Sequence, residues 1–413
     1  MNGARQVGKT WILKEFGQRE YANMAYINCE STEQIEDVFK DFNVSRMVTA
    51  LSVVSGIDIR PEKTLIFLDE VQEYPRALTA LKYFCEDAPR YHVVVAGSLL
   101  GISLHQGVSF PVGKVDMMNL YPMNLAEFIL AMGNKQAVSM LLDGNMKEMG
   151  ALHSFFIEYL RQYYYVGGMP AAVKAFSESR MPNEVRNIQK QILSDYRKDF
   201  SKHTSRSEAE RIAMVWNAIP QQLAKENKKF KYSDVKAGSR ANDFLMAVQW
   251  LLDAGLVYKV SRISKPASPL RFYEESTIFK LFLNDVGLLG ALMDVSAKDM
   301  LLGNNVFSEF KGAFSEQYVL SQMVPFELPT HYYSTNDSQV EVDFVVQTEN
   351  RLLPIEVKAE TNVHAKSLRV FIEKNPNLKG IRLSMLPYRD QEWMENVPLY
   401  CISNLIKENS PMQ

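Results

Sequence analysis

A glycine-rich segment at the start of the chain places the strongest constraint on its fold. Residues 3 to 10 read Gly-Ala-Arg-Gln-Val-Gly-Lys-Thr, and the apolar residues that follow have helical spacing. Gly3 and Gly8 allow a tight loop whose backbone N–H groups converge on phosphate oxygens. In loops of this pattern Lys9 neutralises the β and γ phosphates, and the Thr10 hydroxyl binds Mg²⁺. Because the loop opens a helix, whose N-terminus favours anions, the segment predicts an ATP site in an α/β fold.

Two buried strands downstream are expected to complete this site. Residues 64 to 70 form an apolar run that ends in Asp69 and Glu70, as in a central parallel strand covered on both faces. We expect Asp69 to hold Mg²⁺ and Glu70 to polarise the attacking water. A second run, residues 92 to 98, ends in Ser98, which is a candidate sensor of the γ-phosphate; a simple strand-end cap is the alternative. The order of the three features favours nucleotide binding over a chance loop, whereas hydrolysis is less firmly indicated.

The loop begins very near the first residue. A loop of this kind follows a buried strand, yet only Met1 and Asn2 precede Gly3. Either the native start lies upstream, or this copy lacks the strand that anchors its own loop. A missing central strand would leave backbone groups of its neighbours unpaired, so we expect an upstream start.

Composition excludes several classes of protein. With 413 residues the chain is too long for one ordinary core, which predicts two or three domains. The formal net charge of -2 gives no overall basic excess for nucleic acid, although a local basic face remains open. Three cysteines and six histidines show no paired or metal-ligand spacing, which argues against disulfides and zinc modules. No apolar run reaches the roughly 18 residues of a spanning helix, so we expect a cytoplasmic protein without a membrane partner.

The C-terminal third carries a second constellation of charged residues. Residues 341 to 346 and 352 to 358 have strand patterns a hairpin apart, with Asp343 in the first and Glu356 and Lys358 in the second. Since side chains alternate along a strand, Glu356 and Lys358 share a face that Asp343 can meet. Such carboxylates bind Mg²⁺ through oxygen, and a lysine positions water or stabilises a reacting phosphate.

Glu316, in a helical stretch before this hairpin, is a further candidate metal ligand. The helix, strand and hairpin with these four residues resemble the PD-(D/E)xK phosphodiesterase fold. Two alternatives stay open: a surface hairpin with an ordinary Glu356–Lys358 salt bridge, and a nuclease-like fold that cuts nothing.

The middle of the chain is predicted to be helical. Residues 121 to 205 are rich in helical patterns, with a Gly-Gly-Met-Pro break at 167–170. Residues 209 to 263 read as three helices and a strand, the order of a winged helix. The last of these helices offers few polar or basic residues for a DNA groove, so an ATPase lid or packing module is favoured over DNA readout.

Four motifs in order carry a family resemblance. They are GARQVGKT, LIFLDEVQEYPRALTALKYF, VVVAGSLLG and SFPVGKVDMMNLYPMNLAEF. The chain resembles prokaryotic AAA+ ATP-binding proteins with a C-terminal domain of unknown function. The resemblance implies a AAA+ module, a winged-helix segment and a restriction-endonuclease-like terminal domain, and it includes Arg5 in the loop. Many relatives carry Gly-Arg where this chain has Gly113-Lys114, which argues against an arginine finger at this position because lysine is a point charge.

These features predict three domains. They are a AAA+ P-loop domain with a helical lid at 1–205, a winged-helix segment at 206–265 and a PD-(D/E)xK-like domain at 266–413. The predicted function is ATP binding and hydrolysis with Mg²⁺, driving or gating a domain that acts on DNA or another nucleic acid, in a homo-oligomer as AAA+ modules usually form. The alternatives are a nucleotide-switched regulator of a protein partner, with an inactive nuclease-like domain, and a Mg²⁺-dependent nuclease whose ATPase part regulates access.

Overall fold

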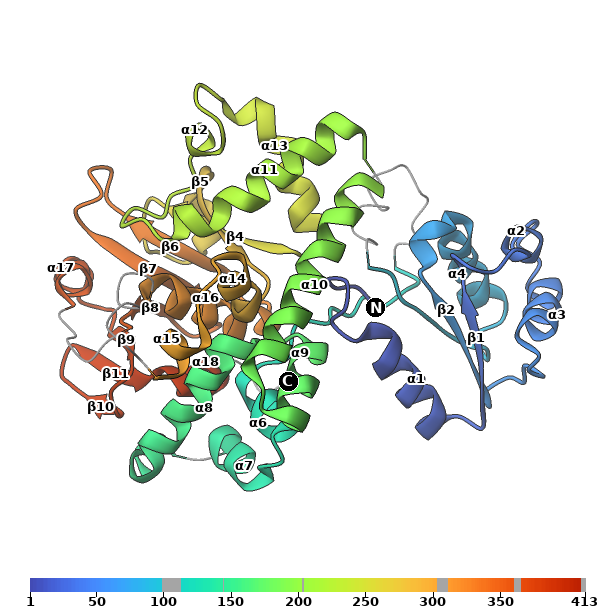
Figure 1. The fold of residues 1–413 in the computed structure, drawn as a ribbon, viewed down its shortest axis with the longest axis horizontal. Coiled ribbons are helices and arrows are strands. Elements are labelled where there is room, and N and C mark those ends of the chain that lie inside the picture. The colour runs from blue at the N-terminus through green and yellow to red at the C-terminus, as the bar shows by residue number, and fades with distance from the viewer. Residues whose placement is uncertain (99–112, 144, 203, 303–310, 360–364, 410–413) are drawn as a thin grey trace. The chain divides into compact units, whose positions relative to one another are not determined.

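The fold is described from a computed structural model that covers residues 1–98, 113–143, 145–202, 204–302, 311–359 and 365–409. The chain forms two compact units (Figure 1). Unit 1 comprises Met1–Tyr121 and Gln249–Leu256, and unit 2 comprises Pro122–Val248 and Val257–Gln413.

Unit 1 is built on a three-stranded parallel sheet of order β1-β2-β3. Its strands are β1 (Asn23–Asn28), β2 (Thr64–Asp69) and β3 (His92–Val95). Its helices are α1 (Lys9–Glu20), α2 (Ile35–Val38), α3 (Val44–Ser55) and α4 (Pro75–Asp87), with the 3₁₀ turn η1 (Val71–Glu73) after β2. The predicted helix after the loop and both predicted strands are therefore present.

Strand β2 is the central strand, between β1 and β3, and all six of its residues are buried. Ile66 and Leu68 pack in the larger core cluster of the unit, which also contains Met47 and Leu51 of α3 and residues of α4. Phe67 points to the other face, where it packs against Leu13 of α1. Figure 1 shows α1 and α3 on opposite sides of the strands. Burying one such side chain contributes about 1.5–3 kcal/mol, so both faces fix the strand that ends in Asp69.

The two residues before the loop pair with neighbouring segments of unit 1. The Met1 nitrogen donates to the Val95 carbonyl at 2.6 Å, and Asn2 forms a parallel bridge with Asn119. A pocket of about 410 Å³ lies between Val93–Val95 and Lys114–Met118, with Met1 at its wall. The first two residues thus lie beside β3 and the segment around Asn119.

Unit 2 combines helices with a mixed sheet. Its helices are α6 (Leu125–Ala131), α7 (Lys135–Asp143), α8 (His153–Val166), α9 (Pro170–Ser179), α10 (Pro182–Lys202), α11 (Arg206–Leu223), α12 (Tyr232–Val235), α14 (Val286–Leu292), α15 (Ala297–Leu302), α16 (Lys311–Met323), α17 (Lys366–Lys374) and α18 (Ile402–Asn409). Its 3₁₀ turns are η2 (Glu148–Leu152), η3 (Leu270–Tyr273), η5 (Val324–Phe326) and η6 (Leu399–Cys401). Helix α13 (Ala241–Asp253) has its first residues in unit 2 and its last in unit 1.

The eight strands of unit 2 form one sheet of order β10-β11-β9-β8-β7-β6-β4-β5. They are β4 (Val257–Ile263), β5 (Glu274–Leu283), β6 (Thr330–Ser334), β7 (Glu341–Gln347), β8 (Leu352–Val357), β9 (Gly380–Ser384), β10 (Arg389–Asp390) and β11 (Met394–Pro398). The predicted hairpin is present as the antiparallel pair β7–β8. The predicted order of three helices and a strand is also present, but β4 belongs to the same sheet as the C-terminal strands. A winged helix therefore stays a prediction.

The Gly-Gly-Met-Pro break joins α8 to α9 as predicted. Gly167 has φ 73°, in the left-handed region, and ends α8. The Gly168 N–H donates to Asp285 at 2.6 Å, and its carbonyl accepts the Met123 N–H at 2.8 Å. A Cβ atom on Gly168 would lie 2.0 Å from the Met123 carbonyl oxygen. The break is therefore a close backbone approach as well as a turn.

Gly168→Ala should destabilise unit 2 by about 3 kcal/mol or more, since the added methyl meets backbone that cannot move freely. Gly150→Ala is the matched control, because nothing lies within 4 Å of its Cβ position. It should change stability by less than about 0.5 kcal/mol. Urea unfolding of both variants measures the difference, and equal stabilities would show that the approach at Gly168 is not tight.

Candidate functional site

The glycine-rich segment forms a loop that leads into α1. Gly3 has φ 145° and Gly8 has φ 101°, both in the region that favours glycine. A Cβ on Gly3 would lie 2.2 Å from the Leu120 carbonyl oxygen. Gly8 is the N-cap of α1 and supplies no capping side chain. The loop therefore presents the start of a helix, where N–H groups and the helix dipole favour an anion.

Lys9 is buried beneath this loop. Its ammonium donates to the carbonyls of Gly3 and Ala4, both at 2.8 Å. Burial lowers the pKa of Lys9 to about 8; Glu70 and Asp69 oppose this shift and Arg5 adds to it. The ammonium is thus held by weak neutral acceptors, and a bound phosphate would be a stronger partner for it.

The first turn of α1 is tied to the end of β2. The Thr10 hydroxyl donates to Asp69 Oδ2 at 2.8 Å, and the Tyr26 hydroxyl donates to the same oxygen at 3.0 Å. Two hard oxygen ligands, one from α1 and one from β2, thus lie side by side. Mg²⁺ takes such ligands together with waters and phosphate oxygens. The residues present fit a magnesium ion at this place.

Glu70 stands directly after β2 in a left-handed backbone conformation, with φ 50° and ψ 42°. Such a conformation costs a non-glycine residue of order 1–3 kcal/mol, and residues held in it cluster at active sites. Its carboxylate accepts the Gln72 amide at 2.7 Å. Ser98 lies three residues after β3 and is 7% exposed. Since β2 and β3 are parallel neighbours, Asp69, Glu70 and Ser98 lie at the same edge of the sheet.

The loop also approaches the segment that follows α13. Gly255 follows α13 with φ 67°, and a Cβ there would lie 3.2 Å from the Ala4 backbone nitrogen. The glycine after the helical pattern could have signalled a helix C-cap, but its contact with the loop had no sequence signal. Lys114, the position at which an arginine finger is not expected, pairs with Glu86 of α4 at 3.2 Å.

In unit 2, the predicted charged residues come from three elements. Asp343 lies on β7, Glu356 on β8 and Glu316 on α16, and Lys358 directly follows β8. Asp343 accepts the Val357 N–H at 2.8 Å, and Lys358 pairs with Glu356 at 2.6 Å. The salt bridge that the first alternative names is therefore present, and its Glu356 is buried.

We call Glu316, Glu341, Asp343 and Glu356 the carboxylate cluster. The sequence analysis missed Glu341 and also missed the two lysines that pair with the cluster. Lys228 pairs with Glu316. Lys280 is fully buried, 2.6 Å from Glu341 and 3.7 Å from Glu316. Glu341 was signalled by its place two residues before Asp343 on the same strand. The two lysines had no signal, because they come from segments distant in sequence.

Charge in the carboxylate cluster is divided unevenly. Burial, and then the charges of Glu316 and Glu356, raise the pKa of Asp343 well above its usual value. Burial alone would raise the pKa of Glu316 too, but Lys228 and Lys280 leave it below its usual value. Among the described residues, no group of three or more His, Cys, Asp or Glu side chains could hold a metal ion. The metal roles of Glu316, Asp343 and Glu356 stay predictions.

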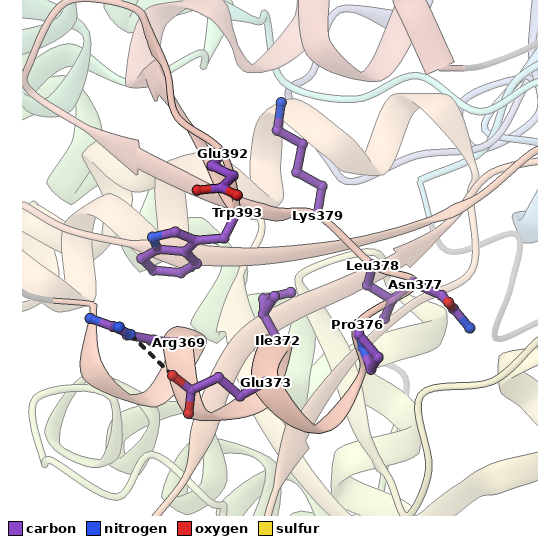
Figure 2. Close-up of a pocket in the computed structure, with 9 residues that line it drawn as sticks. All are labelled: Arg369, Ile372, Glu373, Pro376, Asn377, Leu378, Lys379, Glu392 and Trp393. Carbon is purple, nitrogen blue, oxygen red and sulfur yellow. Dashed lines mark hydrogen bonds and ion pairs between the residues drawn. The ribbon is translucent and has the colours of Figure 1, made fainter.

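A pocket of about 500 Å³ in unit 2 lies apart from every predicted site residue. Figure 2 shows Trp393 and Ile372 in its wall and the Arg369–Glu373 ion pair, 3.1 Å long, at its rim. Both partners of that pair are more than 60% exposed. Because its charges are solvated and satisfy each other, this pocket lacks the converging buried polar groups of a specific ligand site.

Comparison with protein families agrees with the geometry of unit 1. A family model described as an AAA domain matches residues 1–129. The N-terminal region, which includes the loop, β1, β2 and β3, is therefore similar to an AAA domain. Two domains of unknown function follow: DUF8612 matches residues 157–299 and DUF4143 matches residues 311–402.

Comparison with curated proteins gave no match. Among solved structures, the chain is similar to a Walker-type ATPase of Pyrococcus abyssi, with 13% identity and a TM-score of 0.44, over 71% of this chain and 89% of that chain. Within the part of the chain that the structure describes, no helix is long and apolar enough to cross a membrane.

ATP affinity should fall above about pH 8, where free Lys9 loses its proton. A bound phosphate favours the ammonium and raises its pKa, so binding takes up protons: about half a proton near pH 8. Titration calorimetry in buffers of different ionisation enthalpy measures this uptake. Lys9→Arg is the control, because guanidinium does not deprotonate. An unchanged affinity of the wild type from pH 7 to 9.5 would contradict the pKa shift of Lys9.

Proposed function

We propose that the protein hydrolyses ATP with Mg²⁺ at the loop of residues 3–10, in the cytoplasm. The observation that carries this proposal is the hydrogen bond from Thr10 to Asp69, next to a buried Lys9 whose ammonium donates to two backbone carbonyls. This arrangement puts a cation, two hard oxygen donors and a helix N-terminus around one space.

Each residue has a distinct task in this proposal. Gly3 and Gly8 shape the loop so that its N–H groups bind phosphate oxygens, and Lys9 leaves its carbonyl partners for the phosphates. Thr10 and Asp69 hold Mg²⁺, which supplies charge neutralisation at the phosphates when bound. Glu70 orients the attacking water and accepts its proton. Ser98 contacts the γ-phosphate or the water, and Arg5 adds positive charge near the loop.

For the carboxylate cluster of unit 2, we propose a binding role without cleavage. Lys280 and Lys228 supply two positive charges among its carboxylates, where a phosphodiesterase of this fold would need metal ions. ATP turnover would then gate a nuclease-like domain that binds nucleic acid or a protein partner. The intact set of Glu316, Asp343, Glu356 and Lys358 supports the alternative, a Mg²⁺-dependent nuclease.

The rival for unit 1 is a nucleotide switch that binds ATP without useful turnover. The carboxylate of Glu70, directly after Asp69, supports turnover over this rival, because a carboxylate there can accept a proton from the attacking water. Assembly into a homo-oligomer is part of the proposal, since AAA-type sites are usually completed by a neighbour.

Glu70→Gln should retain ATP binding and lose hydrolysis by a factor of about 10²–10³, since the amide cannot accept a proton from water. Lys9→Ala should lose binding itself. Steady-state phosphate release and calorimetric ATP titration measure the two effects. A wild type that binds ATP but releases no phosphate would support the switch, and a wild type that binds no ATP would refute both.

Lys280→Met should destabilise unit 2 by about 3–5 kcal/mol, because it removes the buried partner of Glu341 and leaves Glu316 with Lys228 alone. Lys379→Met is the control, since the pairs of Lys379 with Asp390 and Glu395 lie near the surface, and it should cost less than about 1 kcal/mol.

The wild type should leave DNA and RNA uncut in Mg²⁺. Cleavage that is lost in Asp343→Ala would establish the nuclease instead.

A further inference from the structure

Asp69 is held by donors from three directions. Its Oδ1 accepts the Glu70 N–H at 3.1 Å, and its Oδ2 accepts both the Thr10 hydroxyl at 2.8 Å and the Tyr26 hydroxyl at 3.0 Å. Thr10 and Glu70 belong to the features that predicted the nucleotide site. Tyr26 does not: it lies on β1 and no sequence pattern marked it.

The ring of Tyr26 is fixed on two sides. Tyr26 is the register partner of Phe67 across the β1–β2 pair, and the two rings pack edge to face with centroids 5.2 Å apart. The Lys14 ammonium, one turn after Thr10 on α1, lies 3.7 Å from the centroid of the Tyr26 ring. With the ring held by strand and helix, its hydroxyl is directed at Asp69.

The contact between Tyr26 and Asp69 joins a hydroxyl donor to a carboxylate acceptor over 3.0 Å. Hydrogen bonds of this charge-assisted kind are stronger than those between neutral groups.

We propose that Tyr26 is a positioning residue that orients Asp69 for Mg²⁺. This inference rests on the proposed function, because it assigns Mg²⁺·ATP to the same site. Mg²⁺ requires near-octahedral geometry, and a single carboxylate at a strand end rotates freely unless outer donors fix it. Tyr26 donates to the same oxygen as Thr10, so the two hydroxyls together fix the orientation of the carboxylate. Partners of this outer kind typically change metal affinity by about 10–100-fold when removed.

The test compares Tyr26→Phe with the wild type. Phenylalanine keeps the ring against Phe67 and Lys14 and removes only the hydroxyl. Tyr21→Phe is the matched control, because it removes another hydroxyl of unit 1, one that is hydrogen-bonded to His92 at 2.8 Å. For each protein, the affinity for a non-hydrolysable ATP analogue is measured by calorimetry in EDTA and in saturating Mg²⁺. The ratio of the two affinities is the gain that Mg²⁺ contributes, and it does not depend on turnover.

In Tyr26→Phe we expect an unchanged affinity in EDTA and a Mg²⁺ gain that is smaller by about tenfold. Tyr21→Phe should match the wild type in both. An equal or larger Mg²⁺ gain in Tyr26→Phe would overturn the inference while leaving the proposed function intact. Loss of affinity in EDTA as well would also overturn it, since Tyr26 would then only support the fold. A wild type without analogue binding would refute the proposed function and the inference together.

Discussion

The hydrogen bond between Thr10 and Asp69 joins the two parts of the sequence on which unit 1 depends. It ties the first turn of α1 to the end of β2, 59 residues later in the chain. For this contact to form, β2 must be held at a fixed height in the sheet, which its complete burial achieves. The loop must also lead into α1 at the correct angle, which the left-handed conformation of Gly8 permits. Packing on both faces of β2 thus determines the geometry of a polar site at its edge.

The parts of the site that local pattern encodes were predictable from the sequence. The loop, the buried strand before Asp69 and the β7–β8 hairpin each consist of neighbouring residues, and their spacing alone limits their conformation. Tyr26, Gly255, Lys228 and Lys280 were not predictable. Each reaches its site through strand register or through the close approach of distant segments, which one sequence does not encode in any short pattern. The roles of the predicted residues in binding and catalysis depend on ligands, so they remain predictions.

The two units treat the same kinds of side chain in different ways. In unit 1, a buried lysine is held by carbonyls while the nearby Asp69 is held by hydroxyls and an N–H group, so opposite charges lie near each other without pairing directly. In unit 2, lysines contact the carboxylates and neutralise them. A buried charge that is satisfied by neutral groups can exchange them for a ligand at small cost, whereas a paired one must first break a strong contact. By this argument, a charged ligand displaces the partners of Lys9 in unit 1 at a smaller cost than it would displace the partners of the lysines in unit 2.

Gly255 lies close to Ala4 within unit 1, although the two residues are far apart in the sequence, so unit 1 is discontinuous in sequence. The family match ends at residue 129, but Gln249–Leu256 belongs to the same compact body as the loop. A fragment cut at the family boundary would keep every residue that the motif names and would lack the segment that lies behind the loop. A fragment designed from the sequence family alone would therefore lack Gln249–Leu256, which packs beside the loop.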